Sequence, residues 1–220
     1  MLFITGTDTG VGKTVLTALL AQFLRERGVN AAALKPICSG GRNDARALHA
    51  ALAGVLTLDE INPWHFRAAI APLLAARLEK KSVKLAQVLM HIRATQKKFN
   101  LLLVEGAGGL LSPLGEDFDS RDLMVVLRAT PIIVAPNKLG AVNHVLLTLE
   151  ALPKNLRAKA QVVLVSPPKP DAATAANAKL LEQFLSAGKI FTLPWLEKFA
   201  AESVLKTAGV HQTLRALARI

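Results

Sequence analysis

The sequence has little cysteine, few aromatic side chains and no long hydrophobic run. Cys38 is the only cysteine among 220 residues, which excludes an intramolecular disulfide and favours a reducing, cytoplasmic compartment. Tyrosine is absent and aromatic residues make up 5% of the chain, so no platform for stacking nucleic-acid bases stands out. No run of about 18 apolar residues occurs, and we expect no membrane-spanning helix. No Lys or Arg precedes the short first apolar run, so we expect no signal peptide.

Acidic residues are outnumbered by basic ones, and the formal net charge is +11. The Lys and Arg residues are scattered through the chain and fall mostly at the ends and on the polar faces of expected helices, which is typical of a solvated surface. A positive field also attracts anionic substrates. We therefore expect no specific nucleic-acid partner, although a basic nucleotide-binding protein that contacts nucleic acid stays an alternative.

Hydrophobic residues make up 51% of the chain, which suits one globular domain over residues 1–220. Short apolar runs alternate with helical patterns, which predicts an α/β fold with a mostly parallel central sheet and helices on both faces. We expect strands at 2–5, 30–34, 99–104, 131–135, 161–165 and 189–193. We expect helices at 15–24, 45–53, 68–78, 83–98, 120–128, about 140–152, 172–186 and from 201 onward, with an irregular link at 54–66.

A glycine-rich stretch at residues 6–14, Gly-Thr-Asp-Thr-Gly-Val-Gly-Lys-Thr, joins the first strand to the first helix. Glycines let backbone N–H groups turn inward, and a helix N-terminus favours polyphosphate. Lys13 adds a full positive charge, and the Thr14 hydroxyl can ligate a magnesium ion that bridges phosphates. The usual first glycine would fall at Thr7 but stands one residue earlier, at Gly6. The context still predicts a phosphate-binding loop.

Chemically useful side chains follow the second expected strand. Lys35 and Ser39 come at its carboxyl end, where parallel sheets bind ligands, although a surface lysine before a turn is the plainer interpretation of Lys35 taken alone. Asp44, near the start of the next helix, is either a cap or first-turn residue or a magnesium ligand. The residues alone favour the cap.

The strongest apolar run, residues 99–104, ends at Glu105 and is followed by glycines. In P-loop enzymes an acid at this kind of position acts on magnesium, and the glycines allow a ligand to approach closely. We therefore favour a functional role for Glu105. Residues 140–143 place backbone N–H groups at a second helix start, a potential anion site. A polar first-turn residue is the plain alternative for Asn143.

Taken together, these loops resemble the dethiobiotin synthetase family of biotin biosynthesis. The resemblance extends over most of the chain. The segments that carry it are residues 6–14, Lys35-Pro36 with Ser39-Gly40, Asn43-Asp44, residues 104–109, residues 138–140 with Asn143-His144, and Pro194-Trp195-Leu196. The resemblance implies a seven-stranded, mostly parallel sheet and a homodimer.

The resemblance also implies the reaction. Its reactants are ATP, Mg²⁺, carbon dioxide and 7,8-diaminononanoate. The diamine is first carbamylated, and the carbamate oxygen attacks the γ-phosphate of ATP to give a carbamic–phosphoric anhydride. The second amine then closes the ureido ring and releases phosphate.

By resemblance, each matching residue receives a role. Lys13 and Lys35 would flank the transferred phosphoryl group as catalytic residues. The magnesium ligands would be Thr14, Asp44 and Glu105. The nucleotide would contact these three residues, Lys13, Gly10, Val11, Gly12, Val15, Gly106, Ala107 and Gly108, with Pro194, Trp195 and Leu196 at the purine. The diamine would contact Ser39 and Gly108, and its carboxylate would meet Gly140 and Asn143 of the partner subunit.

Two departures from the family pattern concern specificity. The family usually has an asparagine that reads the adenine edge, where this chain has Ser166-Pro167-Pro168, so the choice of base is left open. The loop between Gly40 and Asn43 is short, which can reshape the diamine pocket.

The sequence also allows three other functions. A switch ATPase of the partition or Min type would carry a signature lysine early in the loop, where Asp8 stands here. A cobyrinic-acid-type synthetase usually carries a glutaminase domain, for which 220 residues leave no room. A related synthetase acting on a different acceptor is the third.

Overall fold

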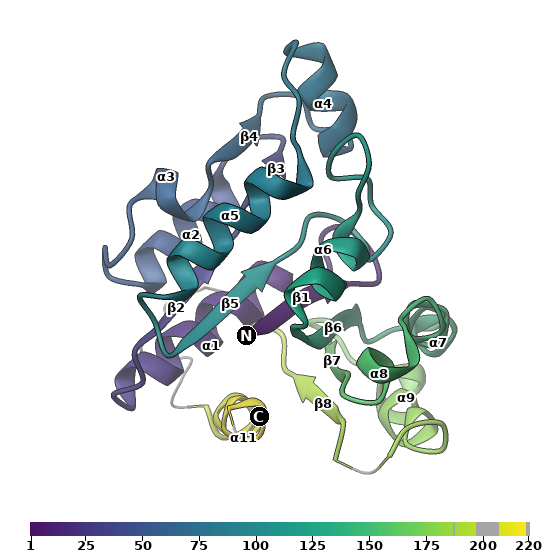
Figure 1. Ribbon diagram of the computed structural model, residues 1–220. Coiled ribbons are helices and arrows are strands. Elements are labelled where there is room, and N and C mark those ends of the chain that lie inside the picture. The colour runs from purple at the N-terminus through teal and green to yellow at the C-terminus, as the bar shows by residue number, and fades with distance from the viewer. Residues whose placement is uncertain (187, 197–206, 219–220) are drawn as a thin grey trace.

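Six parallel strands form the main sheet in the computed structural model, which describes residues 1–186, 188–196 and 207–218 (Figure 1). Their order across the sheet is β2 (Ala31–Leu34), β5 (Leu101–Glu105), β1 (Leu2–Gly6), β6 (Thr130–Pro136), β7 (Gln161–Val165) and β8 (Ile190–Leu193). Every neighbouring pair is parallel. All five residues of β1 are buried, as expected of a central strand covered on both faces. The predicted α/β fold class is confirmed.

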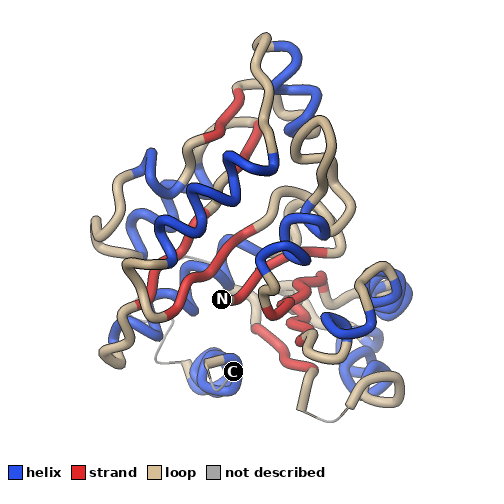
Figure 2. Tube along the Cα trace, viewed as in Figure 1, coloured by secondary structure: helices blue, strands red, loops and turns tan. Residues whose placement is uncertain are grey.

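Helices cover both faces of this sheet (Figure 2). Crossovers between parallel strands are right-handed, so the direction of each step along the sheet decides the face of its helix. The step from β1 to β2 runs one way, and the steps from β2 through β5, β6 and β7 to β8 run the other way. α1 therefore lies on the face opposite to α5, α6, α7 and α9, and α11 contacts both α1 and β8. β1 and β6 are neighbours in the sheet, and the connections that leave them run in opposite directions. In a parallel sheet, ligands bind in the crevice between the carboxyl ends of two such strands.

The predicted helices are present with shifted ends, and one further short helix, α8, was not predicted. Their bounds are α1 Lys13–Glu26, α2 Asn43–Ala51, α4 Pro72–Leu78, α5 Leu85–Gln96, α6 Ser120–Leu127, α7 Ala141–Glu150, α8 Lys154–Arg157, α9 Ala172–Leu181 and α11 Ala208–Leu217. The helix expected from residue 68 begins only at Pro72, because proline lacks an N–H and fits the first helical turn. The start of the last expected helix, at 201, lies outside the described residues.

A short helix and one strand of a separate two-stranded sheet lie within the predicted irregular link at 54–66. β3 (Ile37–Ser39) and β4 (Trp64–Phe66) form their own parallel sheet, and α3 (Leu58–Ile61) precedes β4. Thr57 and Glu60 start α3 with a capping box, a signal that the sequence reading missed. For the described residues, the prediction of an irregular link at 54–66 is therefore wrong. So is the seventh strand of the main sheet that the resemblance implied, because the described part of this sheet has six strands. Pro36 has no N–H for a ladder, and its carbonyl instead accepts from Trp64, so the chain leaves the main sheet after Lys35.

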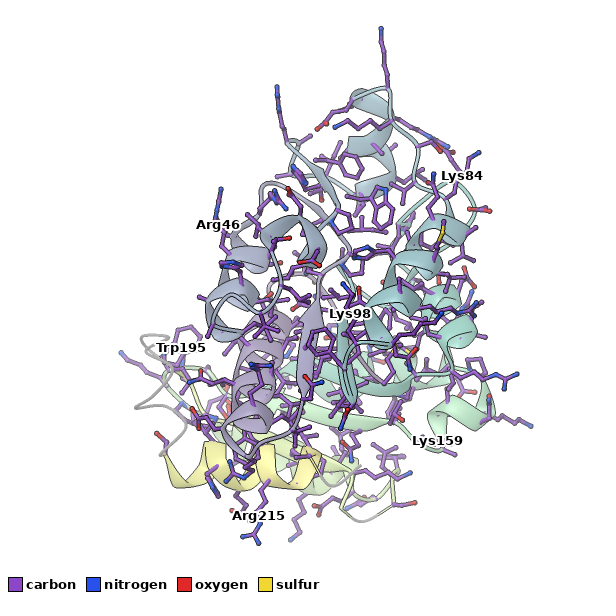
Figure 3. All side chains as sticks on the ribbon, turned by 60° about the vertical axis from the view of Figure 1, so that its left-hand side comes forward. Arg46, Lys84, Lys98, Lys159, Trp195 and Arg215 are labelled. Carbon is purple, nitrogen blue, oxygen red and sulfur yellow. The ribbon has the colours of Figure 1, made fainter. Side chains whose placement is uncertain are left out.

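The surface matches the expectation of scattered basic residues. Arg46 and Arg215 lie on α2 and α11, Lys84 and Lys98 lie at the two ends of α5, and Lys159 follows α8, so the labelled basic residues are spread over the fold (Figure 3). Within the described ranges, no helix combines the length and apolar character needed to cross a bilayer.

Candidate active site

The loop of residues 6–14 folds over the carboxyl end of β1 and leads into α1. Gly10 and Gly12 have φ angles of +73° and +97°, a region that side chains other than glycine rarely adopt. Gly6 is extended, but a Cβ there would lie only 2.7 Å from Val11 Cγ2 and 3.1 Å from Lys13 Nζ. This close packing explains why glycine occupies position 6 in a loop whose usual first glycine would fall at Thr7.

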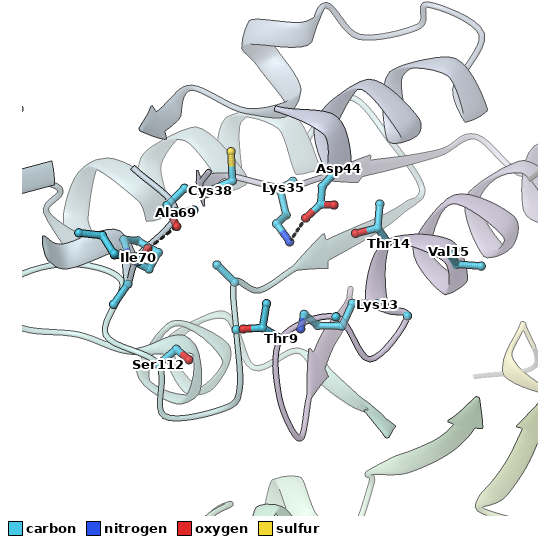
Figure 4. A pocket seen from close by; sticks show the side chains of 17 residues that line it. Thr9, Lys13, Thr14, Val15, Lys35, Cys38, Asp44, Ala69, Ile70 and Ser112 are labelled. Carbon is cyan, nitrogen blue, oxygen red and sulfur yellow. Dashed lines mark hydrogen bonds and ion pairs between the residues drawn. The ribbon is translucent and has the colours of Figure 1, made fainter. Parts of the chain in front are cut away.

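A cavity of about 670 Å³ opens beside this loop (Figure 4). It is bounded by the loop, the segment after β2, the start of α2 and the segment after β5. The lining residues are Thr9, Gly10, Gly12, Lys13, Thr14, Val15, Lys35, Cys38, Ser39, Asp44, Ala69, Ile70, Ala71, Pro72, Ala107, Gly108 and Ser112. We call it the transfer cavity. It is large enough for a small organic acceptor together with phosphate groups.

Four charged or polar side chains meet at the base of the transfer cavity. Lys35 Nζ lies 2.6 Å from Glu105 Oε1 and 2.9 Å from Asp44 Oδ2. The Thr14 hydroxyl donates to the same Glu105 Oε1 at 2.7 Å. Lys35 and Glu105 are buried, whereas the Asp44 side chain is 49% exposed. Residues separated by as many as 91 positions in the chain are thus held within one hydrogen-bonded cluster.

Burial and neighbouring charge compete at this cluster. Burial pulls the pKa of Lys35 down, but the carboxylates of Glu105 and Asp44 outweigh it and raise the pKa above its ordinary value. Burial likewise opposes the charged form of Asp44, yet Lys35 and Thr14 hold its pKa below the ordinary value. Lys35 is therefore a fixed cation between two carboxylates.

Lys13 stands in a different electrostatic setting. Its ammonium donates to the carbonyl oxygen of Asp8 at 2.7 Å, within its own loop. Burial, with the nearby charge of Lys35 second, lowers its pKa from 10.5 to about 8. An incoming anion would favour the charged form, so this lysine is poised to pair with phosphate.

Asp44 lies in the first turn of α2, as the sequence allowed, but it does not cap the helix. The N-cap residue is Arg42, and no side chain makes a cap hydrogen bond there. The Asp44 carboxylate points instead toward Lys35 (Figure 4). The preference for a cap, based on the residues alone, is wrong because the carboxylate pairs instead with Lys35, which follows β2.

A second cavity of about 400 Å³ lies on the other side of the glycine-rich loop. It shares Gly10, Gly12 and Val15 with the transfer cavity and is closed by the ends of β6, β7 and β8. Its lining residues are Gly10, Val11, Gly12, Val15, Pro136, Asn137, Lys138, Val165, Ser166, Pro167, Pro168, Leu193, Pro194, Trp195 and Leu196. Most of these side chains are apolar. We call it the base cavity.

Comparison with known proteins decides the family. A family model described as an AAA domain matches residues 1–203. The ATP-dependent dethiobiotin synthetase BioD of Akkermansia muciniphila is 40% identical over 185 residues, covering 84% of this chain and 87% of that protein. The protein of the same name from Thermodesulfovibrio yellowstonii is 33% identical over 98% of this chain and 97% of that protein. The chain belongs to the dethiobiotin synthetase family.

Solved structures agree on the fold. The MinC:MinD cell division protein complex of Aquifex aeolicus contains a chain that superposes with a TM-score of 0.61 over 100% of this chain and 96% of that one. Its sequence identity is 17%, so this likeness concerns the fold alone. The Min-type alternative thus shares an architecture with the dethiobiotin synthetase family, and sequence similarity separates the two.

Most residues that the dethiobiotin synthetase resemblance singled out lie at one of the two cavities. Those at the transfer cavity are Gly10, Gly12, Lys13, Thr14, Val15, Lys35, Ser39, Asp44, Ala107 and Gly108. Those at the base cavity are Gly10, Val11, Gly12, Val15, Pro194, Trp195 and Leu196. Glu105 lies beneath the transfer cavity and is hydrogen-bonded to two of its lining side chains.

Three of the remaining residues lie elsewhere. Gly106 lies at the carboxyl end of β5, where its N–H donates to the carbonyl oxygen of Ile4 in the neighbouring β1 at 2.9 Å. Gly140 is the N-cap of α7 and Asn143 lies in its first turn, as predicted, but neither residue lines either cavity.

The sequence reading missed several neighbours of the site. Residues 69–72 and Ser112 line the transfer cavity, and Ser39 donates to the carbonyl oxygen of Ile70 at 2.5 Å. Asn62 falls within the predicted irregular link at 54–66, yet it is fully buried behind Lys35. Its buried amide could not be recognised from a single sequence, because asparagine before proline is an ordinary turn dipeptide.

Proposed function

We propose that this protein is a magnesium-dependent ligase that closes the ureido ring of dethiobiotin. The substrates would be 7,8-diaminononanoate, carbon dioxide and ATP, and the intermediates a carbamate and a carbamic–phosphoric anhydride. Family membership supports this reaction. The single observation that carries it is the cluster in which Lys35 joins Asp44 and Glu105 beside the glycine-rich loop.

The two cavities suggest how ATP would lie. The base would enter the largely apolar base cavity next to Trp195, and the phosphates would cross the shared glycines toward the transfer cavity. Phosphoryl transfer needs positioning and neutralisation of charge more than covalent chemistry. Lys13 and Lys35 would supply two positive charges where the γ-phosphate meets the carbamate oxygen.

A magnesium ion fits the same cluster. Glu105 Oε1 is engaged by Thr14 and Lys35, but Glu105 Oε2 is buried with no hydrogen-bond partner among the described residues. Thr14, Asp44 and Glu105 would hold the ion, which would neutralise phosphate charge when bound. Magnesium is commonly held by one or two carboxylates together with substrate phosphates and water, and Asp44 and Glu105 would supply the carboxylates.

The diamine would occupy the outer part of the transfer cavity, near Ser39 and Gly108. Its carboxylate would require Gly140 and Asn143 of a second copy, which implies a homodimer. Two exposed apolar side chains support such an interface, since Leu139, just before α7, is 85% exposed and Leu147, on α7, is 61% exposed. A cytoplasmic location, suggested by the single buried cysteine, completes the proposal.

The test of the proposed function is phosphate release from magnesium-ATP and bicarbonate, with and without 7,8-diaminononanoate. We expect release that depends on the diamine, together with formation of dethiobiotin measured by mass spectrometry. Release at the same rate without the diamine would instead identify a switch ATPase. Diamine-independent binding of ATP without release would point to a different acceptor.

Ser166 is the residue through which base selectivity is most easily tested. The Asn137 amide, although it lies at the base cavity, already donates to the carbonyl of Thr174 and accepts from Asn177. An asparagine carries a donor and an acceptor that match the N6 and N7 edge of adenine, a pairing worth about 1–3 kcal/mol. We expect Ser166→Asn to raise the preference for ATP over GTP and CTP by roughly tenfold or more. Competition binding with the three nucleotides measures this, and Ser166→Ala is the matched control without a new amide.

A further inference from the structure

Asn62 is a buried polar residue that the proposed chemistry does not use. It lies between α3 and β4 and is 0% exposed. A buried amide is costly unless it is hydrogen-bonded, so the identity of its partners says what this side chain holds in place. Both ends of the Asn62 amide are engaged, one by carbonyl oxygens and the other by donors. The partners themselves thus fix the orientation of the amide.

The amide nitrogen of Asn62 holds the backbone of Lys35. Asn62 Nδ2 donates to the carbonyl oxygen of Lys35 at 2.7 Å, with longer contacts of 3.4 Å to the carbonyls of Pro36 and Trp64. The N–H of Lys35 donates to the carbonyl oxygen of Ile61 at 3.0 Å. Both backbone groups of Lys35 are therefore fixed by one short segment, residues 61–62.

The amide oxygen of Asn62 holds the start of the helix that carries Asp44. Asn62 Oδ1 accepts from Arg42 Nε at 3.3 Å and from Cys38 Sγ at 3.1 Å. Arg42 also donates to the backbone carbonyl of Asn62 at 3.0 Å and pairs with Asp59 at 2.8 Å. Arg42 is the N-cap residue of α2, and Asp44 follows two residues later.

We propose that Asn62 is a positioning residue for the transfer cavity, one that sets the relative placement of Lys35 and Asp44. Lys35 follows β2 and Asp44 opens α2, and the chain between them passes through β3 and a turn at Gly40-Gly41. The amide of Asn62 is hydrogen-bonded at both ends of this segment, to the Lys35 carbonyl at one end and to Arg42, beside Asp44, at the other. The proposal rests on the proposed function, because it matters for turnover only if Lys35 and Asp44 act on the transferred phosphoryl group. A misplacement of about 1 Å at such a site can reduce the rate roughly 10²-fold.

Two substitutions test this role. Asn62→Ala removes all side-chain hydrogen bonds. Asn62→Asp keeps an oxygen that accepts from Arg42 and Cys38 but loses the N–H that donates to the Lys35 carbonyl. This variant still allows the measurement if Asn62→Ala does not fold. We expect the kcat for phosphate release to fall about 10²-fold in both variants while the dissociation constant for ATP, measured without magnesium, stays close to its wild-type value. Within the described residues, no hydrogen bond of the Asn62 side chain reaches the glycine-rich loop or the base cavity, which would hold the nucleotide.

Thr57→Ala is the matched control. It removes the capping box of α3, the helix just before Asn62, and leaves every side-chain bond of Asn62 in place. A merely structural role for this segment would lower kcat equally in Thr57→Ala, and that result would overturn the proposal. Wild-type kcat in both Asn62 variants would overturn it as well, as would a fall in kcat accounted for by the unfolded fraction in a urea titration.

Hydrogen exchange separates this proposal from the proposed function. Peptides covering residues 35–44 are expected to exchange faster in the folded Asn62 variants than in wild type, whereas peptides covering β1 and the glycine-rich loop keep their wild-type rates. This readout needs no turnover. If wild-type protein shows no diamine-dependent phosphate release, the proposed function fails, and faster exchange at 35–44 still supports the anchoring of Lys35 and Asp44. Unchanged exchange at 35–44 overturns it.

Discussion

Replacing Lys35 by alanine is expected to nearly abolish dethiobiotin formation while ATP binding is largely retained. Lys35 Nζ lies at the base of the transfer cavity between Glu105 and Asp44, and Lys35 does not line the base cavity. Removing one group that stabilises charge in a transition state costs roughly 10²–10³-fold in kcat. Phosphate release with the diamine measures the loss, and calorimetric titration with ATP measures binding. Wild-type product formation by the variant would remove Lys35 from the mechanism.

Loss of stability must be separated from loss of chemistry in this variant. Lys35→Ala leaves the fully buried carboxylate of Glu105 without its cation, and breaking a buried ion pair typically costs about 3–5 kcal/mol. Replacing both partners, as in Lys35→Met with Glu105→Gln, is often close to neutral for stability. We therefore expect the double variant to unfold at nearly the wild-type urea concentration and still make no product. Lys98→Ala, at an exposed lysine 3.5 Å from Glu60, is the matched control and should keep wild-type activity.

The residue pattern predicted the main sheet because hydrophobic periodicity is local information. Each central strand is a short apolar run, and each strand predicted from such a run is present to within a few residues of its predicted bounds. β3 and β4 escaped prediction because each is only three residues long and is stabilised by pairing with the other across 27 positions of sequence. Such pairings depend on tertiary structure, and the local hydrophobic pattern of the sequence does not predict them.

The candidate site was predictable where chemistry-bearing residues stand at the ends of strands. Glu105 and the loop before Lys13 could be predicted to lie at one site, since the carboxyl ends of parallel strands share one edge of the sheet. The orientation of the Asp44 side chain could not be predicted, because it is decided by the ion pair with Lys35, which follows β2. Asn62 was missed for the same reason, since its partners, Lys35 and Arg42, lie 27 and 20 positions away.

Glu105→Gln is expected to weaken magnesium-dependent turnover, so that more magnesium is needed for the same rate. Glu105 Oε1 is saturated by Thr14 and Lys35, so the buried Oε2, which has no partner among the described residues, is the atom free to face a cation. Glutamine keeps the volume and one acceptor but places an amide group or a neutral oxygen at that position, which removes the negative charge that a divalent ion requires. Changes close to a metal commonly cost 10–100-fold in affinity or activity, so we expect the magnesium concentration for half-maximal rate to rise by roughly this factor.

Two readouts distinguish a magnesium role for Glu105 from a general loss of activity. Binding of manganese-ATP, followed by electron paramagnetic resonance, should weaken in Glu105→Gln in the absence of any acceptor. Saturating magnesium should restore much of the rate, because the variant retains Lys35 and Thr14. Glu116→Gln is the matched control, since Glu116 pairs with Arg77 on the surface at 2.5 Å and lies outside both cavities. An unchanged magnesium dependence in Glu105→Gln, with manganese bound as in wild type, would refute the role. The orphaned Oε2 would then be a cost of holding Lys35 rather than a ligand.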